Sequence, residues 1–201
     1  MKRFVTILSA LLFFTCASNA QQPFHLRFGV EWGGAENMYS WSHFNYKTSE
    51  GYRVDDPYAG FDPNFNGFFN VFIGNDISEK VSVTLSCGFS GLHKGLRALP
   101  VQLRGFYFPK GNHYDGLILY GDLGADMLNF EESPCFVGDA GTGWRLALGG
   151  QFALDFLAGL RLSLDRPVLL DPDSGEKIPA QDINACGAEY LALTFSIALN
   201  F

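Results

Sequence analysis

The stretch FHLRFGVEWG, residues 24–33, places an apolar side chain at every second position. The residues between them are polar, charged or glycine. A period of two is that of a β-strand, because successive side chains of a strand point to opposite faces of a sheet. The stretch therefore predicts a strand with one apolar and one polar face.

Seven further segments repeat this pattern. Their apolar rows cover residues 67–73, 81–89, 99–107, 117–127, 144–152, 156–164 and 191–201. Apart from the shorter row at 67–73, each row has about the 9–11 residues that a tilted strand needs to cross a bilayer. None of the eight apolar rows contains a charged residue. The charges lie on the opposite faces, at Arg27, Glu31, Arg104, Asp122, Asp126, Arg145, Arg161 and Asp165.

The connections alternate between short and long. Short ones cover residues 75–80, 109–115 and 153–155, and longer ones cover 34–65, 91–98, 129–142 and 166–184. Short turns at one end and long loops at the other, with an even strand count, are typical of bacterial outer-membrane barrels. We expect an all-β fold in which residues 21–201 form one eight-stranded antiparallel up-and-down transmembrane β-barrel. Its apolar face points outward and its polar interior is packed.

Composition and the N-terminal segment agree with export. Only 17% of the 201 residues are charged, against about 25% in an average globular domain. The net charge of −7 argues against nucleic acid as a partner. Lys2 and Arg3 precede an apolar run at 4–14, and small residues stand at Ser18 and Ala20. This pattern predicts a signal peptide over residues 1–20, with lipoprotein processing at Cys16 as the rival interpretation.

The chain resembles the small eight-stranded outer-membrane β-barrel proteins, the OmpA/OmpX-like barrels. The similarity lies in the dyad-repeat strands, in LPVQLRGFYF at 99–108 and in the ending LTFSIALNF at 193–201. It implies an outer-membrane location and recognition by the barrel-assembly machinery during biogenesis. The implied assembly signal is Leu193, Phe195, Ile197, Leu199 and Phe201. The superfamily includes adhesins, resistance factors and enzymes, so the resemblance does not select a function.

A soluble lipocalin also has eight alternating strands, but with the apolar side chains inside. The membrane interpretation is favoured because no helix follows the last predicted strand and the Gly-x-Trp spacing is absent. Aromatic residues also stand at the row ends, as at the interfaces with outer-membrane lipid. The predicted girdles comprise Phe24, Tyr107, Phe152, Phe156 and Phe201 at the periplasmic rim, and Trp32, Phe89 and Trp144 at the outer rim.

An eight-stranded barrel has an interior just wide enough for side chains to fill. Four positive and four negative inward residues predict a charge-paired plug, with a narrow polar conduit as the alternative. A general diffusion porin is excluded, because it needs about 16–18 strands. Asp122 and Asp126 lie on one face about 13 Å apart at 3.3 Å per residue, too far for a glycosidase pair.

The segment 34–65 is rich in aromatic residues. Tyr39, Trp41, Tyr46, Tyr58 and Phe61 are candidates for binding a glycan or a protein outside the cell. The alternative is that the first two strands extend above the membrane and the aromatics pack the segment on itself. The function predicted is therefore structural or binding, without a general pore. A lipid-active enzyme and a narrow-channel or hydrophobic-ligand transporter remain alternatives.

The cysteines and histidines suggest few further sites. Cys87 is expected to face lipid as a free thiol, whereas Cys135 and Cys186 fall at the same end of the barrel in an oxidising compartment. A Cys135–Cys186 disulfide is thus a hypothesis. The four histidines at 25, 43, 93 and 113 share no close spacing, so neither a metal nor a cofactor is predicted.

Overall fold

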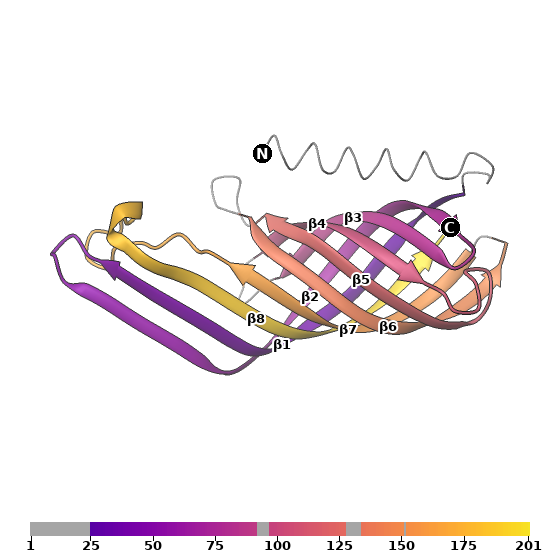
Figure 1. Ribbon diagram of the computed structural model, residues 1–201, viewed down its shortest axis with the longest axis horizontal. Coiled ribbons are helices and arrows are strands. Elements are labelled where there is room, and N and C mark those ends of the chain that lie inside the picture. Colours follow the sequence, from indigo (N-terminus) through magenta and orange to yellow (C-terminus); the bar gives the residue numbers. More distant parts are fainter. Residues whose placement is uncertain (1–24, 92–96, 128–133, 151) are drawn as a thin grey trace.

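The computed structural model describes residues 25–91, 97–127, 134–150 and 152–201. Eight antiparallel strands form a closed barrel in chain order, and the first strand pairs with the last (Figure 1). The strands are β1 Leu26–Lys47, β2 Arg53–Ser78, β3 Val81–Gly91, β4 Arg97–Tyr107, β5 Gly116–Met127, β6 Cys135–Gly149, β7 Phe152–Asp165 and β8 Ile183–Asn200. A short 3-10 helix, η1 Ala180–Asp182, precedes β8. The predicted fold class is confirmed.

The outer wall of the barrel is apolar. Its side chains are unusually exposed for their type, reaching 76% of the full area for Leu123. Other exposed members include Phe28, Val71, Ile73, Leu85, Leu103, Leu119, Leu160, Leu162 and Phe195. An apolar surface that continues around the whole molecule marks a membrane-facing wall. Closure satisfies the backbone, because hydrocarbon offers no hydrogen-bond partners to an open strand edge.

In the described part of the chain, no helix has the length and apolar character to cross a membrane.

Short turns join the strands at one end of the barrel, where the C-terminus also lies (Figure 1). Gly111 in the β4–β5 turn and Gly149 in the β6–β7 turn both have φ of +104°. This left-handed conformation is open to glycine without steric cost. The tight connections were predicted as turns, and they define the end that we call the short-turn end.

The alternation alone had suggested that residues 34–65 form a loop, and this expectation is wrong. The segment is mostly strand, because β1 runs for 22 residues and β2 for 26. The turn between them is residues 48–52, where the Thr48 N–H donates to the Tyr52 carbonyl over 2.9 Å. The first two strands are therefore extended, as the alternative interpretation expected, while the role of their aromatic residues stays a prediction.

Three strands therefore continue past the barrel wall. The pairing of β1 with both β2 and β8 shifts register between Asn37 and Tyr39 and then continues. β3 ends at Gly91 and β7 at Asp165, so the sheet beyond has only three strands. We call residues 39–47, 53–61 and 183–191 the projecting sheet (Figure 1). At its base, residues 188–191 of β8 still pair with residues 162–165 of β7.

The segment between β7 and β8 reaches the tip of the projecting sheet. The Ser49 N–H donates to the Asp171 carboxylate over 2.6 Å. The Tyr52 hydroxyl donates to Asp173 over 3.0 Å. Two hydrogen bonds between segments far apart in the sequence thus hold the tip against the β7–β8 connection.

Two other predicted boundaries were wrong. Residues 129–142 were expected to be a loop, but β6 begins at Cys135. Residues 153–155 were expected to form a turn, but β7 begins at Phe152. In both cases the strand starts earlier than the apolar row indicated, which brings Asp139 and Asp155 into the barrel.

Candidate functional site

The barrel interior contains all eight of the charged residues that the alternation assigned to it. Each is buried, with at most 5% of its area exposed. Asp139 and Asp155 are buried with them and were missed. Their signal was present in the sequence, because Asp139 has the parity of Arg145 on β6, and Asp155 has the parity of Arg161 on β7.

Asp155 organises the short-turn end of the interior. Arg145 donates to its two carboxylate oxygens over 2.7 and 2.6 Å, and Arg27 donates to one of them over 3.1 Å. Asn200 donates to the same carboxylate over 3.0 Å. One acid therefore pairs two arginines from different strands.

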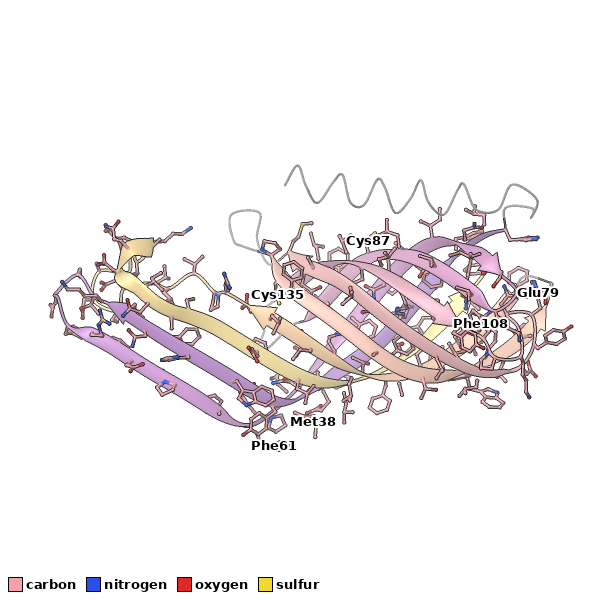
Figure 2. All side chains as sticks on the ribbon, in the orientation of Figure 1. Met38, Phe61, Glu79, Cys87, Phe108 and Cys135 are labelled. Atoms are coloured by element: carbon pink, nitrogen blue, oxygen red, sulfur yellow. The ribbon has the colours of Figure 1, made fainter. Side chains whose placement is uncertain are left out.

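Aromatic rings fill the space around these arginines. The Arg145 guanidinium lies 4.2 Å from the centroid of the Phe108 ring. Arg27 lies 5.1 Å from the Phe106 ring and 5.3 Å from the Phe108 ring, in cation–π contact with both. Figure 2 shows Phe108 at the short-turn end, close to Glu79. Charge pairs and rings together block this end of the interior.

The middle of the interior is held by Arg104. It donates to Asp122 over 2.8 Å and to Glu31 over 2.9 Å. The Ser196 hydroxyl donates to the other Glu31 oxygen over 2.6 Å. The Tyr120 ring lies 5.1 Å from the Arg104 guanidinium. Arg104 thus joins β1 to β5 across the barrel.

The outer half of the interior contains Arg161 and three acids. Arg161 pairs with Asp139 over 3.4 Å and lies 5.0 Å from the Phe68 ring. Asp126 and Asp165 are the other two acids, and both are buried. The interior is packed with side chains along its length, and this arrangement supports the plug that the sequence predicted.

The aromatic residues assigned to the girdles lie on the outer wall wherever the structure describes them. Phe24 lies outside the described residues. Phe201 stacks on Phe28 at 5.4 Å and meets Phe152 edge-on at 5.7 Å, at the short-turn end. Tyr107, Phe156, Trp32 and Phe89 are exposed on the wall.

Trp144 is on the wall but not at the outer rim. It pairs with Leu117 near the beginning of β5 and with Phe156 near the beginning of β7. Both positions lie toward the short-turn end. The prediction placed Trp144 wrongly because β6 begins at Cys135 and reaches Trp144 only near its far end.

The proposed assembly-signal residues lie on one face of β8. Leu193, Phe195, Ile197 and Leu199 alternate with the inward, buried residues Ala192, Thr194, Ala198 and Asn200. The backbone N–H of Phe201 donates to the Phe28 carbonyl over 2.8 Å. The last strand is therefore the one that closes the ring, while its recognition during assembly stays a prediction.

The predicted disulfide is not formed, and Cys87, Cys135 and Cys186 are free. Cys135 is on β6 and Cys186 on β8, with β7 between them. Two strand spacings are about 9.6 Å, beyond the roughly 7 Å that a disulfide spans between Cα atoms. The Cys186 thiol instead donates to the Pro167 carbonyl over 3.1 Å. Cys87 is exposed on the outer wall, as expected for its row.

The candidate binding aromatics divide between the two faces of the projecting sheet. Tyr39 pairs with Phe61, and Trp41 is on the same face two residues further along β1. The Tyr39 and Trp41 rings are in contact, with centroids 4.4 Å apart. By their register, Tyr46 and Tyr58 lie on the opposite face of the sheet. Figure 2 shows Phe61 with Met38 where the sheet leaves the barrel.

A groove of about 640 Å³ lies against the projecting sheet near its junction with the barrel. Trp41, His43 and Glu189 contribute aromatic, basic and acidic groups to it, and Leu162 is its contact with the apolar wall. The remaining lining residues are Ser42, Tyr58, Ala185, Cys186 and Gly187. This groove is the candidate binding site.

His43 is fixed by an acid at the side of the groove. Its Nε2 lies 2.8 Å from the Asp55 carboxylate, and both side chains are exposed. The hydrogen bond with His43 is the main cause that lowers the pKa of Asp55 below its ordinary value. The contact orients the imidazole beside Trp41.

The other histidines do not join this site. His25 and His113 lie at the short-turn end, where they line one small pocket with Arg27 and Asp76. His93 lies outside the described residues. Among the residues that the structure places, no three histidine, cysteine or acidic side chains are grouped so as to hold a metal ion.

A closed ring of eight antiparallel strands, apolar outside and charge-paired inside, defines this protein as an eight-stranded transmembrane β-barrel. Comparison with solved structures finds outer-membrane proteins. OprG from Pseudomonas aeruginosa has a TM-score of 0.47 and 11% identity, covering 87% of this chain and 95% of that chain. The outer membrane protease OmpT from Escherichia coli has a TM-score of 0.44 and 9% identity, covering 92% and 99%. Neisserial surface protein A has a TM-score of 0.36 and 14% identity, covering 85% and 96%.

No protein-family model and no curated protein matches the sequence.

Proposed function

We propose that this chain is an integral protein of the bacterial outer membrane whose sealed barrel anchors a saccharide-binding sheet outside the cell. The observation that carries the proposal is the groove on the projecting sheet. It combines the exposed Trp41 ring with His43 and Glu189 in one concave surface of about 640 Å³. This volume lies within the range of small-molecule sites, about 300–1,000 Å³.

The chemistry of the groove favours a sugar. A sugar ring has apolar C–H faces that stack on an aromatic ring, and hydroxyls that bond to polar side chains around it. Trp41, supported by Tyr39, supplies the ring, and the imidazole and carboxylate supply hydrogen-bonding groups.

The location follows from the wall and from the predicted signal peptide. An even-stranded barrel with an apolar exterior is typical of the bacterial outer membrane. In that orientation the short turns face the periplasm and the projecting sheet faces outward. Outer-membrane lipid then covers the wall, and the barrel-assembly machinery is the expected partner during insertion.

The packed interior argues against the transport alternative. Arg145, Arg27 and Phe108 fill the short-turn end, and Arg104 crosses the middle. A lipid-active enzyme is not what we propose either, because His43 on the projecting sheet is separated from His25 and His113 at the short-turn end. We therefore assign a non-enzymatic binding role.

Binding of the purified, detergent-solubilised protein to a saccharide array, followed by titration calorimetry with the best ligand, tests the proposal. We expect Trp41→Ala to weaken binding at least tenfold, about 1.4 kcal/mol. Tyr114→Ala is the matched control, because Tyr114 is an exposed aromatic at the short-turn end, lining a different pocket. Binding to no saccharide, or equal binding by wild type and Trp41→Ala, would overturn the proposal. Binding of a protein ligand without binding of any saccharide would also overturn the proposal.

A further inference from the structure

Glu189 contributes a carboxylate to the groove on the projecting sheet. It is exposed on β8, and it also lines a second groove of about 550 Å³ at the outer end of the barrel. His43 lines the first groove and Arg166 the second, yet Glu189 forms no ion pair within the described part of the chain. His43 is engaged with Asp55 instead. The Glu189 carboxylate is therefore available to a ligand of the groove.

The strand register places this carboxylate beside the Trp41 ring. Glu189 of β8 is the direct partner of Trp41 of β1. Residues directly opposite each other in an antiparallel pair point to the same face of the sheet, and their Cβ atoms are about 4.5–5.5 Å apart. Both side chains are exposed. An acid and an aromatic ring thus stand side by side in the groove.

Gly187 leaves room for a ligand next to this pair. It is the direct partner of His43, two residues further along each strand from Trp41 and Glu189. A Cβ added to Gly187 would meet no atom within 4 Å. The groove therefore continues past Glu189 over a strand position that has no side chain. A group held between Trp41 and Glu189 has space there for the sugar ring that bears it.

The part of the chain around the groove is acidic. Residues 39–62 and 166–191, which include the projecting sheet, its tip and the β7–β8 segment, contain nine aspartates or glutamates and four lysines or arginines. The resulting net charge of −5 is most of the −7 of the whole chain. A cleft surrounded by charges of one sign attracts ligands of the opposite sign. The surroundings of the groove therefore favour a cationic ligand over an anionic one.

We infer that the saccharide bound in this groove is an amino sugar, whose protonated amino group is held by the Glu189 carboxylate and the face of the Trp41 ring. A cation over the face of a tryptophan ring is attracted by the ring electrons. Hydrogen bonds from an ammonium group to a carboxylate are strengthened by the two charges. A sugar that bears a carboxylate or a phosphate would instead be repelled by Glu189. The inference rests on the proposed saccharide-binding function and names the class of sugar.

The test compares the trimer of glucosamine with the trimer of N-acetylglucosamine, which differ only in the acetylation of the amino groups. Each is titrated by calorimetry into the full-length protein in detergent at about pH 6, where a glutamate is ionised and an amine is protonated. We expect the wild type to bind the glucosamine trimer at least tenfold more tightly than the acetylated trimer. Added salt should reduce this preference, because it screens charges at an exposed site. Glu189→Gln should remove the preference.

Glu176→Gln is the matched control, because Glu176 is an exposed acid of the β7–β8 segment that lines neither groove. It changes the net charge by the same amount and should keep the preference. Equal binding of the two trimers by the wild type overturns the inference, and so does equal loss of the preference in both variants. If other saccharides of the array bind but neither trimer does, the inference is wrong and the proposed function stands. If no saccharide binds, both are wrong.

Discussion

At the scale of single residues, the interior is stabilised by acids shared between arginines. Asp155 is the clearest case, because it accepts from both Arg145 and Arg27 and is 1% exposed. Two guanidinium groups from β1 and β6 depend on one carboxylate. The same residue also anchors Asn200, near the end of the strand that closes the ring.

We predict that Asp155→Ala destabilises the barrel by about 3–5 kcal/mol, the cost of removing one partner from a buried ion pair. Two buried arginines would lose their acid while remaining in place. The unfolding midpoint in urea, measured on detergent-refolded protein, checks this. Asp115→Ala is the control, since Asp115 is exposed in the β4–β5 turn, and it should change the free energy of unfolding by less than about 1 kcal/mol. An unchanged midpoint for Asp155→Ala would contradict the assignment.

A glycine gives a second prediction at this scale. A Cβ added to Gly159 would collide with the Tyr120 hydroxyl and lie 2.6 Å from Asp139 Oδ1. Gly159→Ala should therefore displace both groups and cost about 1–3 kcal/mol, as overpacking does. Gly187→Ala meets nothing within 4 Å and should be close to neutral. The same urea midpoints measure both variants, and a neutral Gly159→Ala would show that Tyr120 moves aside freely.

Alternation predicted which residues face inward, but not what they touch. A period of two assigns a side chain to a face, so Arg27 and Arg145 could be placed inside from the sequence alone. Their common partner Asp155 comes from a third strand, and a strand pattern contains no information on register between strands. Asp126 was predicted as one of a balanced set of charges, and its lack of partners emerges only from the packed interior.

At the scale of elements, the projecting sheet is the main departure from the predicted layout. Residues 39–47 and 53–61 have no apolar row, as we expect of a sheet whose two faces lie outside the membrane in the proposed orientation. The alternation that marks a membrane strand is therefore lost although the strand continues. The sequence pattern therefore did not show how long β1 and β2 are.

The contact between the hairpin tip and the β7–β8 segment should depend on pH. Hydrogen bonds from backbone N–H groups, Ser49 first, hold the pKa of Asp171 below its ordinary value. A carboxylate with a lowered folded pKa stabilises the fold above its unfolded pKa of about 3.9, and the stabilisation is lost as pH falls through the folded pKa. The tip should thus stay docked from neutral pH to about pH 5 and loosen below about pH 4.

Hydrogen exchange of residues 48–52 at a series of pH values, corrected for the intrinsic rate, measures this docking. In the wild type, protection should fall only at the acidic end. Asp171→Asn should show weaker protection that varies little with pH, because the amide accepts without titrating. Protection that decreases equally in both proteins would assign the change to another group.

At the scale of the whole molecule, the barrel and the projecting sheet have separate tasks. The ring closes through β1 and β8 from the pair Gly29–Asn200 onward, close to the short-turn end. The projecting sheet shares those two strands and extends beyond the ends of β3 and β7. The sequence predicted the closed ring, because eight alternating rows permit closure and a membrane leaves no open strand edge. The extent of the projecting sheet could be seen only in the structure.

The filled interior of the barrel predicts that it conducts no ions. Arg27, Arg145 and Asp155 with the Phe108 ring close the short-turn end, and Arg104 with Glu31 and Asp122 closes the middle. Purified protein inserted into planar bilayers should give no stepwise single-channel currents. Its insertion is verified by the different gel migration of heated and unheated samples. Removing the bulk of the plug with Phe108→Ala and Phe106→Ala together should still give at most small, irregular currents, because the charge pairs remain. Stable channels in the wild type would show that the plug moves, and would revive the transport function.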